Sequence, residues 1–147
     1  DYMFSGCTSL KSIDISKADF KNVISASHMF ENCNSLTSIH IANFTNLQNA
    51  NNMFSNCISL KSIEFTNFIT DNLKEMSYMF SGCTSLKSID LSKFDLSKVE
   101  QMGYAINNCS SLTSLDFSKS NVFRVKNIVS LFSGCHSLKT VTMNDLV

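Results

Sequence analysis

The side chains with the clearest chemical potential are six cysteines, which could form disulfides, bind zinc or pack as free thiols. They recur at intervals of 24 to 26 residues, at Cys7, Cys33, Cys57, Cys83, Cys109 and Cys135. Finger-type zinc sites need two cysteines a few residues apart, and this spacing does not supply them. We predict instead one column of buried free thiols, with one thiol in each turn of a stacked structure. Disulfides between neighbouring turns stay open, because strands about 4.8 Å apart lie within the Cα range of a disulfide.

The three histidines form no recognisable catalytic or metal-binding constellation. His28, His40 and His136 lie at three different positions relative to the nearest cysteine. A general base or a metal ligand needs partner side chains held around it, and the sequence offers no such partners. We therefore predict that the protein is not an enzyme and uses no metal and no cofactor.

The cysteine spacing belongs to a repeat that runs along the whole chain. An apolar pair precedes each cysteine by four residues, and the six repeats counted from these pairs begin near residues 3, 29, 53, 79, 105 and 131. A fixed period of 20 to 50 residues is typical of a solenoid, in which no single repeat can bury its own apolar face. We predict a single repeat domain over residues 1–147, which looks like a fragment of a longer array because it starts and stops within repeats.

Within one repeat, the period of the apolar residues changes from helical to strand-like. Val99, Met102 and Ile106 are spaced by three and four residues, which predicts a short amphipathic helix. Leu115 and Phe117 then point one way and the residues beside them the other, which predicts a short strand. The predicted fold is an α/β solenoid of about six coils, with a parallel sheet on one face and short helices on the other.

The residue before each cysteine is always glycine or asparagine, at Gly6, Asn32, Asn56, Gly82, Asn108 and Gly134. These two residues tolerate left-handed backbone best, so we predict that this column ends each helix. The single 24-residue step has two residues between Phe44 and Leu47 where the next repeat has four between Phe68 and Leu73. The shortening leaves the apolar columns in register, so we place it in the turn between strand and helix.

The fourth repeat, MFSGCTSLKSIDLSKFD from Met79 to Asp95, resembles the BspA-type leucine-rich repeat found in surface proteins of bacteria and some protists. Its pattern of Met-Phe, Cys, Leu and Ile-x-Leu recurs along essentially the whole chain, and the fifth copy departs from it with Ala105-Ile106. The resemblance implies a leucine-rich-repeat solenoid that is on the cell surface or secreted and serves adhesion or interaction. It carries over no catalytic residues and says little about the ligand.

Polar residues on the open face of the predicted sheet form three rows across the repeats. An acidic row lies between the two apolar strand residues and comprises Asp14, His40, Glu64, Asp90, Asp116 and Thr142. A row of serine and threonine lies two places earlier. Beside it lies a basic row of Lys11, Thr37, Lys61, Lys87, Thr113 and Lys139.

We predict that the charged members of these rows form a binding strip for a protein or a glycan, because solenoids characteristically bind through an extended sheet face. The strip comprises Lys11, Asp14, His40, Lys61, Glu64, Lys87, Asp90, Asp116 and Lys139. The acidic row could also bind a cation. The alternative is a solvated strand surface, on which the lysines offset stacked carboxylates that would otherwise repel one another.

Composition narrows the classes of partner. Twelve Lys and Arg balance twelve Asp and Glu, which argues against a nucleic-acid partner. No apolar run approaches the length of a membrane span. Two further functions stay open: end-to-end stacking of copies into a filament or lattice, and an intracellular scaffold with reduced thiols.

Overall fold

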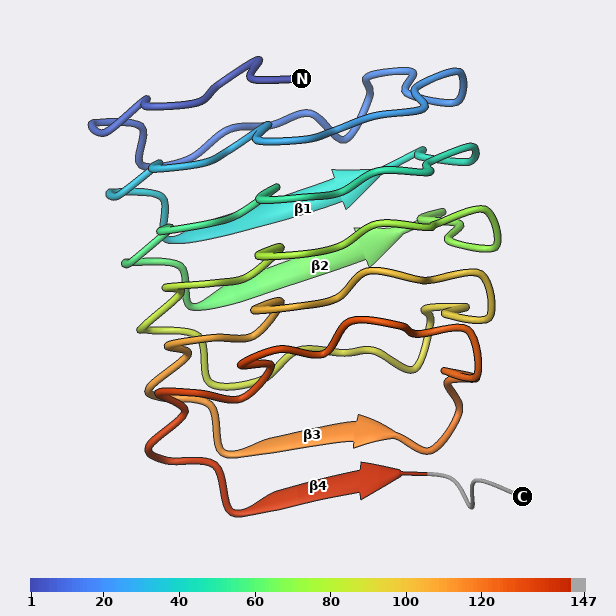
Figure 1. Cartoon of the computed structure of the whole chain (residues 1–147). Coiled ribbons are helices and arrows are strands. Elements are labelled where there is room, and N and C mark those ends of the chain that lie inside the picture. Colours follow the sequence, from blue (N-terminus) through green and yellow to red (C-terminus); the bar gives the residue numbers. More distant parts are fainter. Residues whose placement is uncertain (144–147) are drawn as a thin grey trace.

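The structure of the protein is a computed structural model that describes residues 1–143. Figure 1 shows the chain winding as a stack of flat coils, with the strands on one side and the return segments on the other. The first coil and the last described coil lie at opposite ends of the stack. The predicted solenoid is therefore confirmed as the architecture of the described residues.

Four short strands form two separate parallel pairs: β1 (Ser38–Ala42) with β2 (Ser62–Thr66), and β3 (Ser114–Phe117) with β4 (Thr140–Met143). The register of each pair follows the repeat, so that His40 lies opposite Glu64, and Asp116 lies opposite Thr142. The predicted parallel pairing of successive strands is confirmed for these two pairs.

The sheet is interrupted between the two pairs. Within the described residues, the equivalent segment of the fourth repeat, residues 88–91, forms no strand. Phe65 lies beside this break, and its ring packs edge-on against Phe94 with centroids 5.1 Å apart. The same column holds the smaller Ile41 and Leu91 in the adjacent repeats.

The predicted helices are absent from residues 1–143, and overlapping turns replace them. In the segment where the sequence predicts a helix, the amide of Met102 donates to the carbonyl of Asn127 at 3.1 Å, and the amide of Tyr104 donates to the carbonyl of Val129 at 2.8 Å. Alternate amides thus bond to the next coil, whereas a helix needs them for bonds to the residue four places earlier. The backbone of Tyr104 is also left-handed, with φ of 58°. The apolar spacing of three and four residues therefore reflects consecutive four-residue turns.

Every repeat contains two left-handed residues four positions apart, and the second and third repeats each contain one more, Asn43 and Asn67. The predicted column of glycine and asparagine is left-handed throughout, with φ between 57° and 77°. It closes a turn rather than a helix, as the amide of Cys33 shows by donating to the carbonyl of Phe30 at 3.2 Å. The second column precedes the apolar pair and comprises Tyr2, His28, Asn52, Tyr78, Tyr104 and Ser130, with φ between 50° and 58°. Positive φ at the third residue of a turn is the type II pattern, which normally selects glycine or asparagine.

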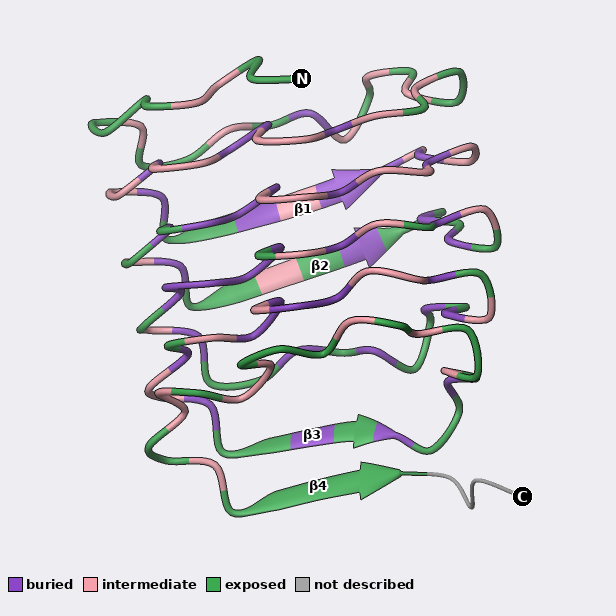
Figure 2. Cartoon of the chain, in the orientation of Figure 1, coloured by how far each residue is buried: buried purple, intermediate pink, exposed green. Residues whose placement is uncertain are grey.

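The core is a set of apolar columns between the strand side and the return side. Phe30, Phe54 and Phe80 are fully buried and stack in parallel, with centroids 5.6 and 5.8 Å apart. Burying one such side chain contributes about 1.5–3 kcal/mol. Figure 2 shows that buried positions are concentrated in the middle repeats and that the outer repeats are more exposed. Each coil is therefore stabilised mainly by its neighbours.

The shortened repeat keeps this core intact. The shortening follows β1, in the return segment that contains Phe44 and Leu47, both of which are fully buried. Phe44 stacks on Phe20 of the first repeat with centroids 4.5 Å apart. In the first repeat, Ala18 stands at the position equivalent to Phe44. Phe20, two residues later, therefore supplies the ring that packs on Phe44 from the first coil.

Candidate functional site

The structure places the predicted strip on one exposed face, along the strand side of the stack. All its lysines, Asp14, Glu64, Asp90 and Asp116 are exposed, whereas His40 is half-buried. The amide of Lys61 donates to the carbonyl of Thr37 at 2.9 Å, and that of Lys139 donates to Thr113 at 2.9 Å. The backbone of the basic row is thus used between coils, which leaves its side chains free to face a partner.

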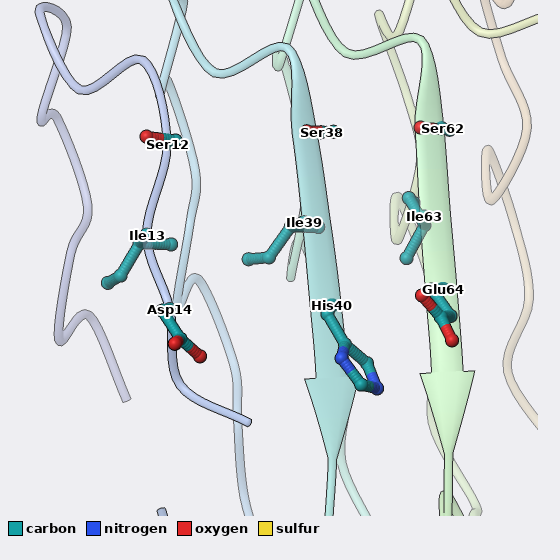
Figure 3. Close-up of a pocket in the computed structure, with 9 residues that line it drawn as sticks. All are labelled: Ser12, Ile13, Asp14, Ser38, Ile39, His40, Ser62, Ile63 and Glu64. Carbon is teal, nitrogen blue, oxygen red and sulfur yellow. The ribbon is translucent and has the colours of Figure 1, made fainter. Parts of the chain in front are cut away.

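The first three repeats form a shallow hollow of about 480 Å³ on this face. Figure 3 shows its three rows, one residue of each row from each repeat: Ser12, Ser38 and Ser62; Ile13, Ile39 and Ile63; Asp14, His40 and Glu64. The structure therefore brings together the acidic members of the first three repeats. Asp90 and Asp116 continue the row beyond the break in the sheet.

Local hydrogen bonds favour the ionised form of the three aspartates in the acidic row. A carboxylate oxygen of Asp14 accepts from the hydroxyl of Ser16 at 2.6 Å and from its amide at 3.0 Å. These bonds, followed by the charges of Lys17 and His40, lower the pKa of Asp14 below its usual value. The same turn lowers the pKa of Asp90 and Asp116. The row therefore presents negative charge at neutral pH.

The basic and acidic rows do not neutralise each other by direct contact. Within residues 1–143, no ion pair joins a lysine of the strip to a carboxylate of the strip. His40 instead shares a hydrogen bond of 3.0 Å, from its Nε2, with the hydroxyl of Thr66. Both rows therefore keep their charges available to a ligand.

A cation site has no geometric support in the part of the chain that the structure describes. Groups of three or more His, Cys, Asp or Glu side chains that could hold a metal ion are absent there. Neighbouring members of the acidic row belong to different coils and use their oxygens in local turns, as Asp14 and Asp90 do. A hard cation would need several of these oxygens at one point.

The cysteines form one column of free thiols inside the stack. Cys33, Cys57, Cys83 and Cys109 are fully buried, Cys135 is half-buried and Cys7 is exposed. From the second repeat onward, each thiol donates to a backbone carbonyl of the preceding repeat at 3.0–3.2 Å. Burial raises the pKa of Cys57 and of Cys109 to about 12. These thiols are therefore unreactive at neutral pH, because the nucleophile is the thiolate.

Sequence reasoning missed the second left-handed column as a surface feature. Tyr2 stacks on His28 with centroids 4.4 Å apart, and Tyr78 stacks on Tyr104 at 4.7 Å. Such pairs contribute about 0.5–1.5 kcal/mol, which offsets the cost of a left-handed residue that is not glycine. The available signal was the recurrence of a ring immediately before the apolar pair in four of the six repeats.

The stacked coils, the parallel strand side and the polar strand face define a leucine-rich-repeat solenoid. The family model described as "BspA type Leucine rich repeat region (6 copies)" matches residues 1–93. The model described as "Mycoplasma protein of unknown function, DUF285" matches residues 49–145. Each match covers more than half of the chain. The chain therefore belongs to the BspA-type leucine-rich-repeat family.

Two solved structures resemble the chain. One is a leucine rich cell surface protein from Faecalibacterium prausnitzii, with 25% identity and a TM-score of 0.65 over 92% of this chain. The chain spans about a third, 32%, of that protein. The other is a leucine-rich repeat protein from Bacteroides ovatus, with 22% identity, a TM-score of 0.45, and coverage of 83% of this chain and 41% of that one. No curated protein matches the chain.

The structure also bears on membrane insertion. Among the described residues, none belongs to a helix that is long and apolar enough to cross a bilayer.

Proposed function

We propose that the protein is a non-enzymatic interaction module on the cell surface or outside the cell, which binds a protein or a glycan through the strand-face strip. Support for the location comes from its family and from the Faecalibacterium prausnitzii structure, which is described as a cell surface protein. The observation that carries the proposal is the strip itself: exposed rows of opposite charge that make no ion pairs with each other within residues 1–143.

The strip suits recognition by hydrogen bonds and charge. Its hydroxyl row is small and flat, so a partner can approach the backbone closely at Ser12, Ser38 and Ser62. The acidic row lies two residues further along each strand, and its ionised carboxylates accept hydrogen bonds from hydroxyl, amide or ammonium donors. The basic row on the other side supplies donors. A ligand that crosses several coils can therefore contact all three rows, and each repeat adds similar contacts.

The test compares binding with and without the carboxylate charges. The variant D14N/E64Q removes two charges from the hollow and keeps acceptor oxygens, so the turn at Ser16 can form as before. The matched control D19N/D71N removes two exposed charges from the return segments. Each protein is applied to arrays of extracellular proteins and glycans. Binding that D14N/E64Q loses and D19N/D71N keeps supports the strip, whereas binding that both variants keep contradicts it.

Self-assembly by end-to-end stacking of copies is a second candidate, favoured by the repeat itself. Because successive coils have matching surfaces, the ends of two stacks of such coils are complementary to each other. Light scattering of the full-length protein tests this function: fibres or polydisperse growth support it, and discrete monomers contradict it.

Reductant adds information to the same measurement. If assembly occurs and reductant leaves it unchanged, the contacts between copies are non-covalent. If reductant dissolves the assemblies, they depend on disulfides between chains.

A further inference from the structure

Several of the positive charges of the return side belong to two columns that follow the point where each coil leaves the strand side. These two columns, the corner columns, change character along the stack. The first column comprises Lys17, Asn43, Asn67, Lys93 and Lys119; the second comprises Asn22, Asn46, Asn72, Lys98 and Arg124. Both columns hold asparagine in the second and third repeats and a cation in the fourth and fifth. We call Lys93, Lys98, Lys119 and Arg124 the basic quartet.

Hydrogen bonds show that neighbouring members of each column lie side by side. In the first column, the side-chain amide nitrogen of Asn67 donates to the side-chain oxygen of Asn43 at 3.2 Å. In the second column, the ammonium group of Lys98 donates to the side-chain oxygen of Asn72 at 2.9 Å. Successive coils are about 4.8 Å apart, so the quartet forms a grid of two columns by two coils.

Lys93 and Lys119 of the quartet line a hollow of about 510 Å³, which is separate from the one on the strand face. Its polar lining comprises Ser92, Lys93, Asp95, Ser97, Lys119 and Asn121. All four cations of the quartet are exposed, and within residues 1–143 none of them takes part in an ion pair.

Carboxylates oppose the positive charge of the quartet and do not fully cancel it. Asp90 lies close enough to Lys93 and Lys119 for their charges, after the hydrogen bonds from Ser92, to lower its pKa. Lys98 acts in the same way on Asp95, Lys119 on Asp116, and Arg124 on Glu100. Because Glu100 is paired with Lys126 at 2.7 Å, the four cations of the quartet face three other carboxylates, an excess of one positive charge. Like charges in adjacent coils repel.

We infer that the basic quartet is a second binding site, which takes a linear anionic glycan bearing sulfate or carboxylate groups. Cations in successive coils can bind acidic groups along a polymer that runs parallel to the solenoid axis. Ser92 and Asn121 supply neutral donors and acceptors for the sugar hydroxyls between those groups. Phe123, which is 62% exposed and adjacent to Arg124 in the sequence, supplies an apolar face for a sugar ring.

The choice of a glycan over other polyanions follows from the size and composition of the site. A nucleic-acid-binding groove usually has a long basic stripe and an excess of positive charge. The net charge of this chain is zero, which argues against a nucleic acid as the ligand. A membrane surface attracts clusters of four to eight cations that lie beside a membrane-spanning or amphipathic helix, and the described residues contain no helix. The mixture of cations, hydroxyls, an amide and one exposed ring fits an acidic sugar chain.

The experiment uses heparin as the probe and asparagine as the replacement, because asparagine occupies both columns in the second and third repeats. The variants K93N/K119N and K98N/R124N each remove one column of the quartet. The control K17N/K21T removes two cations from the same corner of the first repeat, where asparagine and threonine stand in the next repeat. Thermal unfolding verifies that all variants fold. The full-length protein and its variants are eluted from immobilised heparin with a salt gradient.

We expect both quartet variants to elute at clearly lower salt than the parent and the control to elute with the parent. With two of four contacts removed, the dependence of affinity on salt should fall to roughly half. Equal loss in the control would overturn the inference, since general charge would then explain retention. Quartet-dependent binding to single-stranded DNA or to anionic lipid vesicles as tight as to heparin would also overturn it. Because the strand-face strip is unchanged in these variants, failure here leaves the proposed function standing.

Discussion

Replacing Cys83 by aspartate tests the buried thiol column most directly. Cys83 is fully buried in the middle of the stack, and its thiol donates to the carbonyl of Phe54 at 3.2 Å. The introduced carboxyl has no cation beside it, since Cys57 and Cys109 are its neighbours in the column. It must therefore stay protonated in the folded state or place an unpaired charge among apolar side chains.

The loss of unfolding free energy in C83D can be calculated from the free energy needed to keep the buried carboxyl group protonated. A free aspartate has a pKa of about 3.9, and each pH unit above this value costs about 1.4 kcal/mol if the folded group stays neutral. At pH 7 this amounts to about 4 kcal/mol, a large part of the 5–15 kcal/mol that stabilises a typical domain. Because a solenoid is held together by neighbouring coils, damage in the fourth repeat weakens the contacts on both sides.

Urea unfolding of C83D, C7D and the parent at pH 7 and pH 5 measures this effect. Cys7 lies in the same column and is exposed, so C7D should cost no more than about 0.5 kcal/mol. The folded-state pKa of the carboxyl introduced by C83D is raised, so the defect should grow as pH rises above about 4 and shrink to about 1.5 kcal/mol at pH 5. Similar losses in C83D and C7D, or a C83D defect that does not change with pH, would refute the buried column.

Three further predictions concern the alkaline limit and the turns. Burial raises the pKa of Cys57 and Cys109 from about 9 to about 12. The stability that each buried thiol contributes should be fully present below pH 9, and on the order of 2–3 kcal/mol of it should be lost by pH 11. Urea unfolding of C57S/C109S should therefore show a smaller loss of stability at alkaline pH than the parent. In G82A, the added Cβ would lie 2.4 Å from the side-chain oxygen of Asn56, so a destabilisation of about 1–2 kcal/mol should be partly reversed by adding N56G. Y104A should cost about 1 kcal/mol in thermal unfolding, through loss of the stacked ring pair.

The repeat made the solenoid predictable, because its columns depend only on spacing. The position of the strands followed from the alternation of Leu115 and Phe117, and β3 covers both residues. The left-handed column before each cysteine followed from its restriction to glycine and asparagine. These features are local consequences of residue type, so a single sequence with several copies of one repeat is enough to predict them.

The return side was mispredicted because two structures share one apolar spacing. A helix and a chain of four-residue turns both place apolar residues three and four positions apart. The difference lies in Tyr104 and its equivalents, whose backbone is left-handed although tyrosine and histidine rarely adopt that conformation. Hydrogen bonds to the neighbouring coil and stacking across coils override the intrinsic preference of these residues. A single repeat cannot reveal this effect, since both stabilising contacts come from the adjacent repeats.

The division between constant and variable columns separates folding from recognition in this chain. The column of Cys57 and Cys83 keeps one residue type in every repeat, because each member fills the same space against its neighbours. The acidic row and the corner columns vary from repeat to repeat. In the corner, Asn43 and Asn67 have left-handed backbone and Lys93 and Lys119 do not, so the local backbone changes with the residue. Lys93 and Lys119 are exposed and make no ion pair within residues 1–143, which leaves their charge available to a partner. A partner that recognises such columns must read the difference between repeats, which requires a ligand long enough to cross more than one coil.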